Sequence, residues 1–236
     1  MLRKPSLLLY LDLQHIGYCL PRDSSRYAAL NLGNGNQHFE QLSQTWSQLP
    51  QDVYLRDAGT YRYRRYVVLE VSTNKTHVLP YEPHYQNSSY NRLNGGFSRN
   101  FATFSPSVLN NPVFQQVLNW SIAMISRPDA QNWKVQCHQF RITGDEKQEG
   151  KPTPEGIHQD GAEYVFIMLI KRHNIEGGVT RLYKNRDTIF EGMLAQPGDA
   201  VLLNDKKLFH SVSSIHPLRK GELAYRDVLV LTFHQR

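Results

Sequence analysis

The chain has 236 residues, which is the size of one folded domain that can bury a core without disulfides. Its 27 Lys and Arg residues against 21 Asp and Glu give a net charge of +6, and these charges are spread along the chain without a basic block. A hydrophobic fraction of 40% excludes a disordered chain. The longest apolar stretches, at residues 7–11 and 164–170, are too short to cross a membrane.

The N-terminus and the cysteines favour a cytoplasmic protein. The run MLRKPSLLLYLDLQH begins like a signal peptide, but Asp12, Gln14 and His15 interrupt it and no small-residue cleavage site follows. Cys19 and Cys137 form neither a CxxC pair nor a disulfide framework, as expected in a reducing compartment. We therefore expect the N-terminus to be the first folded element of a cytoplasmic protein.

Two amphipathic helices are predicted in the first half of the chain. The first covers residues 37–49, where apolar side chains recur at helical spacing before Pro50. The second begins at Pro112, with Asn110 or Asn111 as its N-cap. Both helices are expected to pack an apolar stripe against a sheet.

The rest of the chain reads mainly as strands, which are rich in β-branched and aromatic residues. The predicted strands cover residues 61–71, 133–142, 164–170, 179–183, 189–195, 200–203, 208–215 and 228–233. Short strands at regular spacing, separated by turn residues, favour a sandwich or jelly-roll barrel over alternating βα units.

We predict one mainly β domain with buttressing helices (α+β) over residues 1–236. Helices and strands of about 1–130 would support a β core over about 131–236. Residues 81–105 are irregular and rich in aromatic side chains, which is typical of a lid or pocket wall.

The chemistry is predicted to centre on His158, Asp160 and His210. His158 and Asp160 are two residues apart in PEGIHQDG, so on an extended chain both side chains point to one face. His210 follows 52 residues later on another predicted strand. Two imidazoles and one carboxylate on one side of a metal are the facial triad of non-haem Fe(II) oxygenases. A single HxD tripeptide is common, and an isolated histidine is more often a packing residue. The hypothesis therefore depends on the HxD motif being followed by a distant histidine on a later predicted strand.

Arg226 stands at the start of the last predicted strand, RDVLVLTF. Its guanidinium offers a planar fork that suits a carboxylate. The alternative is a surface ion pair with Asp227 or Glu222. As the fourth member of an ordered set, Arg226 is interpreted as an anion-binding residue.

The ordered set HQD…H…R resembles the iron and 2-oxoglutarate-dependent dioxygenases. The surrounding segments EGIHQDG, NIEGGVTRLY, PGDAVLLND and FHSVSSIHP are similar to the bacterial group that hydroxylates free L-amino acids, the L-isoleucine hydroxylase-like enzymes. DAGTYRYRRY, PHYQNSSYNRLNGGFSRNF and HQFRI extend the resemblance upstream to about Gln51. The first forty residues are not matched.

This resemblance implies a double-stranded β-helix, the jelly-roll or cupin-like fold. It implies Fe(II) bound by His158, Asp160 and His210, and the distal carboxylate of 2-oxoglutarate bound by Arg226. With O₂ as the further co-substrate, the implied reaction is hydroxylation of an amino-acid side chain with release of succinate and CO₂.

Four residues are candidates for contact with the substrate: Arg64, Tyr85, Asn94 and Arg99. Arg64 belongs to YRYRRY at 61–66, where alternating basic and aromatic residues also suggest nucleic-acid stacking. Because no extended basic groove is evident, we expect a small-molecule partner and neither nucleic acid nor membrane.

Cys137 and His138 are neighbours on a predicted strand, so they face opposite sides and cannot easily share one ion. We assign both to packing.

Alternative functions remain. The chain could be a dioxygenase acting on a peptide, a protein residue, a nucleobase or another small molecule. It could also be a non-catalytic, metal-binding cupin-like module, which would have no use for Arg226. A zinc hydrolase is disfavoured because HExxH is absent. The sequence defines neither the oligomeric state nor the amino acid and carbon that react.

Overall fold

Antiparallel strands dominate the computed structural model, which describes residues 7–23, 32, 35–72, 75–126 and 132–236. The helical elements are α1 (Leu7–His15), η1 (Pro21–Asp23), α3 (Gln37–Gln44), η2 (Thr45–Gln48), α4 (Pro106–Leu109) and α5 (Pro112–Ile125). The strands are β1 (Tyr18–Cys19), β2 (Arg62–Ser72), β3 (Lys75–Val78), β4 (Asn132–Gly144), β5 (Tyr164–His173), β6 (Ile175–Gly177), β7 (Val179–Lys184), β8 (Asp187–Met193), β9 (Ala200–Asn204), β10 (Phe209–Val212), β11 (Ile215–Pro217) and β12 (Ala224–Gln235).

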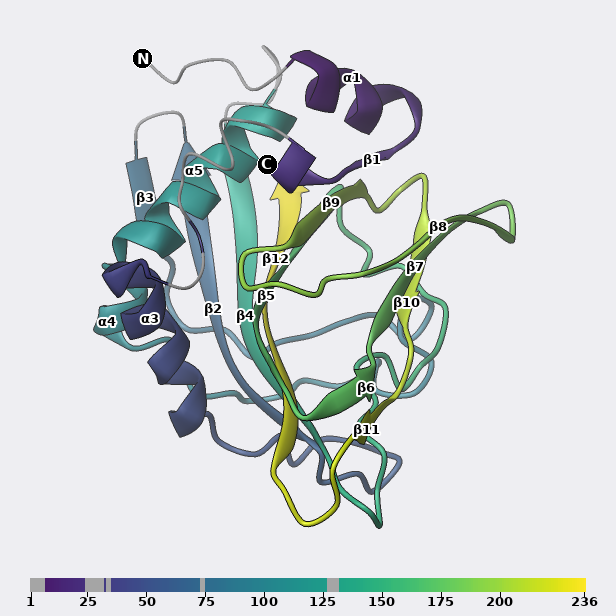
Figure 1. Ribbon diagram of the computed structural model, residues 1–236. Helices are drawn as coiled ribbons and strands as arrows, with labels where there is room; N and C mark the ends of the chain where they lie inside the picture. The colour runs from purple at the N-terminus through teal and green to yellow at the C-terminus, as the bar shows by residue number, and fades with distance from the viewer. Residues whose placement is uncertain (1–6, 24–31, 33–34, 73–74, 127–131) are drawn as a thin grey trace.

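Two facing sheets form the core of the fold. The large sheet has the strand order β1-β9-β5-β12-β4-β2-β3, and the smaller one has the order β10-β7-β8. A short pair, β11-β6, lies below the smaller sheet in the view of Figure 1. Helices α3 and α5 cover the outer face of the large sheet, on the side away from β7, β8 and β10 (Figure 1). The prediction of a mainly β, jelly-roll fold with buttressing helices is confirmed.

Burial of strand β5 on both faces explains why its sequence is a continuous apolar run. Phe166 and Met168 join the core beneath the helices, whereas Val165 and Ile167 point the other way, into the cluster that includes Leu182 of the smaller sheet. Because both faces of this strand are covered, alternation between polar and apolar residues is lost. The layered packing therefore follows from the sequence of the central strands.

The two predicted helices form where their capping residues stand. The Asn36 side chain accepts hydrogen bonds from the backbone N–H groups of the first turn of α3, and Asn111 does the same for α5. Asn111 also donates to the backbone oxygen of His38 at 2.9 Å, which ties the two helix starts together. The first helix is shorter than predicted, because its last turn tightens into the 3₁₀ helix η2.

The predicted strand at 208–215 is wrong in one respect, since it is two strands. β10 pairs with β7, and β11 pairs with β6, so the chain changes partner between them. The residue pattern of this segment indicates extended chain but not which neighbouring strand supplies the hydrogen bonds, so the break could not be inferred. The short elements α1, β1, β3, α4 and β6 were also not predicted as such.

The N-terminal part of the chain contributes directly to the large sheet. β2 pairs with β4 from Arg62↔Ile142 to Ser72↔Asn132, and β4 pairs in turn with β12. The assignment of residues 1–236 to one domain remains a prediction. Among the described residues, no helix is both long enough and apolar enough to cross a membrane.

Candidate active site

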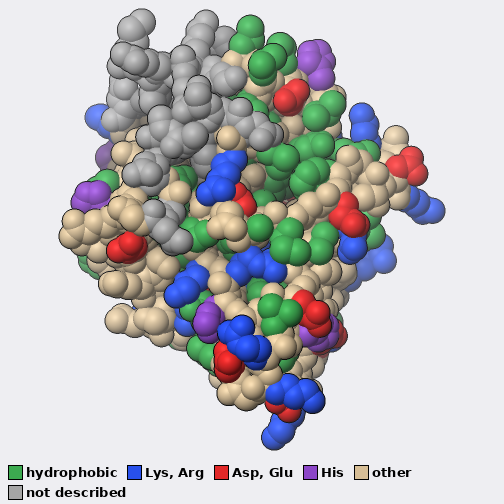
Figure 2. Space-filling view, viewed as in Figure 1, with side chains coloured by type: hydrophobic (Ala, Val, Ile, Leu, Met, Phe, Trp, Pro, Cys, Tyr) green, Lys and Arg blue, Asp and Glu red, His purple; other side chains and the backbone are tan. Residues whose placement is uncertain are grey.

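A cavity of about 320 Å³ lies between the large sheet and β10. Strands β2, β4 and β12 form its floor, and the loops that contain residues 84–99 and 152–161 close its sides. This volume suits small molecules. On the molecular face shown in Figure 2, Lys and Arg side chains are scattered among Asp and Glu rather than gathered into a basic patch.

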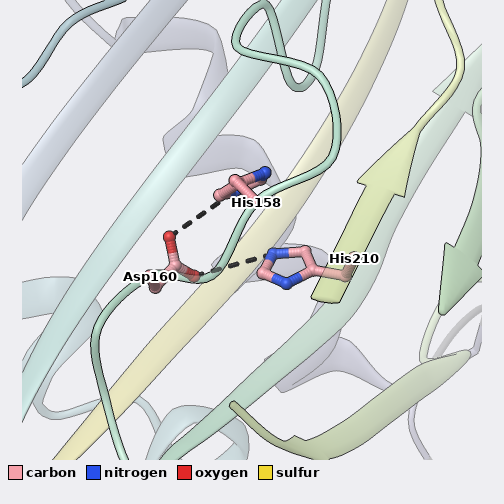
Figure 3. A group of neighbouring side chains, drawn as sticks. All are labelled: His158, Asp160 and His210. Carbon is pink, nitrogen blue, oxygen red and sulfur yellow. Dashed lines mark ion pairs between the residues drawn. The ribbon is translucent and has the colours of Figure 1, made fainter. Parts of the chain in front are cut away.

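His158, Asp160 and His210 meet at one wall of this cavity (Figure 3). An isolated antiparallel bridge joins the backbones of the two histidines, with N–H···O distances of 3.0 and 2.9 Å. Asp160 Oδ1 is 3.6 Å from His158 Nε2, and Asp160 Oδ2 is 3.7 Å from His210 Nε2. One ligand atom from each residue lies within 4.8 Å of the others, so the three side chains fit around a single metal ion.

The hydrogen bonds of His158 leave the correct nitrogen available for a metal. Its Nδ1 is 3.0 Å from the backbone oxygen of Gly156. Because a carbonyl oxygen only accepts, Nδ1 carries a hydrogen, so Nε2, which faces Asp160 and His210, is the nitrogen that can give up its proton and bind a metal.

Burial and charge act differently on the three groups. Burial, together with the charge of His158, lowers the pKa of His210 to about 3, so its imidazole is neutral, as metal ligation requires. Burial also disfavours a charged His158, but the hydrogen bond to Asp160 and the charges of Glu155 and Asp160 outweigh it and raise the pKa of His158 to about 10. Burial raises the pKa of Asp160, but the hydrogen bond from His158 and the neighbouring imidazoles outweigh burial, so this pKa is lowered. The carboxylate is thus ionised and surrounded by imidazoles.

Asp205 holds the loop that carries Asp160. Its buried carboxylate accepts hydrogen bonds from the backbone N–H groups of Asp160, Gly161 and Ala162 at 2.8–3.0 Å. Its Oδ1 also lies 3.8 Å from Nδ1 of His210. One side chain therefore contacts the loop of one candidate ligand and stands beside another.

Arg226 lies inside the same cavity on β12, with 2% of its surface exposed. The predicted alternative of a surface ion pair is wrong, because Asp227 binds Arg141 at 2.7 Å and Glu222 binds Arg219 at 2.8 Å. Within the described ranges, Nε and Nη2 of Arg226 have no hydrogen-bond partner.

Arg172 stands beside Arg226 and adds a second positive charge. Burial and then Arg172 lower the pKa of Arg226 to about 10, which leaves it charged at neutral pH. The β6–β7 turn passes closely here: Gly178 has φ +72°, and a Cβ on it would meet Arg226 Cδ at 3.2 Å. The result is a buried, donor-rich pocket that suits a carboxylate.

A second buried group of cations lines the cavity and consists of Arg62, Arg64 and Arg99. Asp52 contacts two of them, at 2.8 Å from Arg62 and 3.8 Å from Arg64. With three guanidinium groups against this one carboxylate, the cluster carries an excess positive charge. An atom of each arginine, namely Arg62 Nη2, Arg64 Nε and Arg99 Nε, lacks an acceptor in the part of the chain that the structure describes.

Two histidines accept hydrogen bonds from the arginines of this cationic cluster. Arg64 Nη2 is 2.8 Å from Nδ1 of His138, and Arg99 Nη2 is 2.9 Å from Nδ1 of His84. An arginine only donates, so each Nδ1 accepts and each Nε2 carries the hydrogen. Burial and the neighbouring arginines hold the pKa of both imidazoles well below the ordinary range, which keeps them neutral. The assignment of His138 to packing is therefore corrected: it faces the cavity, while Cys137 faces the core.

The cationic cluster is separate from Arg226. In the register of the large sheet, Ile142 of β4 lies between Arg226 of β12 and Arg62 of β2. Two strand spacings separate the backbones by about 10 Å. The cavity therefore has two positions for an anion.

The four residues predicted to contact substrate lie in different places in the structure. Arg64 and Arg99 belong to the cationic cluster, and Tyr85 is a half-exposed residue on the cavity wall. Asn94 does not line the cavity: it is fully buried, and its Oδ1 accepts from the backbone N–H of Arg56 at 3.0 Å. Its expected contact with substrate is thus replaced by a structural role in the loop.

Sequence reasoning missed several residues of the site, namely His84, His138, Glu155, Arg172 and Asp205. Asp205 closes PGDAVLLND and Glu155 stands in PEGIHQDG, so both lay within the quoted motifs. Alternation along the strand predicted that Cys137 and His138 face opposite sides of the sheet. It did not predict which of the two faces the cavity. The predicted pocket wall at 81–105 does supply His84, Tyr85 and Arg99 to the cavity.

Comparison with known proteins gives one family match. The family model described as 2OG-Fe dioxygenase matches residues 43–232. A curated 3(1)-hydroxy-L-isoleucine 4-dioxygenase from Pantoea ananatis is 22% identical over 161 residues, which are 66% of this chain and 65% of that protein. An L-isoleucine-4-hydroxylase from Bacillus thuringiensis is 24% identical over 156 residues, 64% of each chain. The matches thus span slightly less than two thirds of these relatives.

Solved structures share the fold over nearly the whole chain. A BsmA homolog from Methylobium petroleophilum PM1 superposes with a TM-score of 0.85 at 29% identity, covering 97% of this chain and 92% of that one. The protein named IDO from Bacillus thuringiensis gives a TM-score of 0.76 at 17% identity, covering 97% and 98%. The second of these likenesses is evidence for the fold alone.

Proposed function

Since this chain belongs to the 2OG-Fe dioxygenase family, which uses Fe(II), 2-oxoglutarate and O₂, we propose that it hydroxylates the side chain of a free L-amino acid. The observation that supports this proposal most directly is the second anion position in the cavity. Arg226 accounts for the distal carboxylate of 2-oxoglutarate, and the cationic cluster then remains for a carboxylate of the substrate. The relatives named for isoleucine and hydroxyisoleucine support this substrate class.

His158, Asp160 and His210 would hold the metal from one side and leave its other positions facing the cavity. Bound Fe(II), with 2-oxoglutarate and O₂, supplies the oxidising chemistry for an unactivated C–H bond. Arg226 and Arg172 would orient 2-oxoglutarate by its far carboxylate. Arg64 and Arg99 would fix the substrate at its carboxylate, which aims its side chain toward the metal.

The architecture of the cationic cluster suits a positioning task. The guanidinium carbon of Arg64 lies 3.9 Å from the ring centre of Phe101 and 4.5 Å from that of Phe140. Together with the bond to His138, these stacked rings hold the fork in one orientation. Preorganisation of this kind favours one substrate pose.

A reaction screen tests the proposal. The protein with Fe(II) and 2-oxoglutarate is supplied in air with each of the twenty amino acids, with N-acetylated amino acids, with short peptides and with oligonucleotides. We expect free amino acids to stimulate succinate release and to gain the mass of one oxygen atom. Stimulation by peptides or oligonucleotides alone would favour the alternative dioxygenases, and no 2-oxoglutarate binding at all would favour a metal-binding module.

A further inference from the structure

Glu155 is the acidic side chain of the cavity wall that the metal site does not use. Its side chain is 10% exposed, and it precedes Gly156 on the loop that leads to His158. Its Oε2 is buried and has no hydrogen-bond partner among the residues that the structure describes. A buried carboxylate oxygen without a donor is unfavourable, so the position suits a ligand that brings one.

The other oxygen of Glu155 faces the centre of the site. Oε1 is 3.4 Å from Nε2 of His158. With the imidazole hydrogen on Nδ1, which donates to Gly156, Nε2 has no hydrogen to offer once it binds a metal. Once a metal is bound, neither oxygen of Glu155 has a hydrogen-bond donor among the described residues, and this carboxylate lies directly beside the metal position. This state calls for a cationic donor from outside the chain.

Glu155 also lies near the cationic cluster. Its charge is felt by Arg99, whose pKa burial and Arg62 lower to about 10 while Asp52 and Glu155 act in the opposite direction. Arg99 and Glu155 both line the cavity. The same cavity thus contains a group of donors and one acceptor, which together complement a zwitterion.

We propose that Glu155 accepts the α-ammonium group of the substrate while Arg64 and Arg99 hold its α-carboxylate, so that the enzyme selects free, unblocked α-amino acids. This inference rests on the proposed function and makes it more specific. N-acylated amino acids and plain carboxylic acids satisfy the cationic cluster but leave Glu155 unpaired. They are disfavoured because a site built to bind an ammonium group penalises ligands that lack it.

Binding without turnover tests this assignment. Isothermal titration under argon measures L-isoleucine and its deaminated analogue 3-methylpentanoate against the protein loaded with Fe(II) and 2-oxoglutarate. If another of the twenty amino acids binds more tightly, that amino acid and its deaminated analogue replace this pair. The variant is Glu155→Gln, which keeps the shape, and the matched control is Glu149→Gln, a partly exposed carboxylate that does not line the cavity.

The expected result is a change of selectivity. Glu155→Gln weakens amino-acid binding at least about tenfold and leaves the deaminated analogue within about twofold of wild type, because only the ammonium contact is lost. Glu149→Gln changes neither. The visible band of the Fe(II)–2-oxoglutarate complex is retained in both variants.

Other outcomes overturn the inference. Equal weakening of both ligands, or of neither, would remove Glu155 from ammonium recognition while leaving the proposed function intact. Loss of the visible band in Glu155→Gln would place Glu155 with the metal ligands instead. If the wild-type complex binds no free amino acid, the proposed function itself fails, and this inference fails with it.

Discussion

The carboxylate of Asp205 accepts a hydrogen bond from the backbone N–H of Asp160 at 3.0 Å, so one buried aspartate fixes the loop of another. Gly161 and Ala162 donate to the same carboxylate. Since Asp205 follows β9 and His210 lies in β10, this contact links the two chain segments that meet at the metal position. The geometry of the site therefore depends on a residue that would not touch the metal.

Replacing Asp205 is expected to weaken metal binding. Asp205→Ala removes three acceptor contacts from the 160–162 loop, and loss of such supporting contacts typically lowers metal affinity by about 10–100-fold. The matched control is Asp199→Ala at the other end of β9, where Asp199 accepts from Ala195 and Gln196 in the same manner. Anaerobic Fe(II) titration in the presence of 2-oxoglutarate measures both. Equal affinity for Fe(II) in the two variants would refute the supporting role.

Arg226→Lys is expected to weaken 2-oxoglutarate at least about tenfold, because an ammonium group does not replace a planar fork. Fe(II) binding alone should be unchanged, since Arg226 does not belong to the metal group. Arg181→Lys, a partly exposed position paired with Glu191, is the control. A 2-oxoglutarate titration of the visible band reports the result. Wild-type affinity in Arg226→Lys would contradict the anion-binding role.

Asp52 should stabilise the fold in a pH-dependent way. Burial raises its pKa, but Arg62 and Arg64 outweigh burial and hold it below the ordinary 3.8. The stabilisation is therefore fully present above about pH 4 and is lost as pH falls through the lower folded pKa.

Asp52→Asn provides the measurement of this linkage. We expect the free energy of unfolding to drop by about 3 kcal/mol at neutral pH, because two arginines lose their buried partner. Urea unfolding from pH 7 downward measures the difference in free energy of unfolding between the variant and wild type. We expect this gap to narrow below about pH 4. Asp187→Asn, at an exposed position, should unfold with the same free energy as wild type. A gap that stays constant through this range would disprove the linkage.

Tyr85 is expected to shield the reaction from water. It lines the cavity although it is 53% exposed, whereas Tyr81, 56% exposed, does not line it. Tyr85→Ala should raise succinate formed per hydroxylated product severalfold, because an open site loses control of the oxidation. Tyr81→Ala should leave this ratio unchanged. Identical coupling in both variants would exclude the shielding role.

Phe101 belongs to the same predicted lid segment but has another role. It is buried and stacks on Arg64, so it positions the cationic cluster rather than covering the cavity. Aromatic density in the sequence indicated a pocket wall, yet it could not separate a rim residue from a ring behind an arginine.

The central strands and the candidate metal ligands were predictable from sequence because they depend on local rules. Period-two spacing brought His158 and Asp160 to one face, and apolar runs marked β5 and β12. The cationic cluster was not predictable as a unit. It combines Arg64 on β2, His138 on β4 and Arg99 on a loop, and their meeting depends on strand order and register, which residue patterns specify poorly.

The most direct test is whether His158, Asp160 and His210 bind one ferrous ion together. Fe(II) and 2-oxoglutarate are added without air, and the weak visible charge-transfer band is recorded for wild type and for Asp160→Ala and His210→Ala. We predict the band in wild type, with saturation at one Fe(II) per chain, and its loss in both variants. Undiminished bands in both variants, or no band in wild type, would contradict the account.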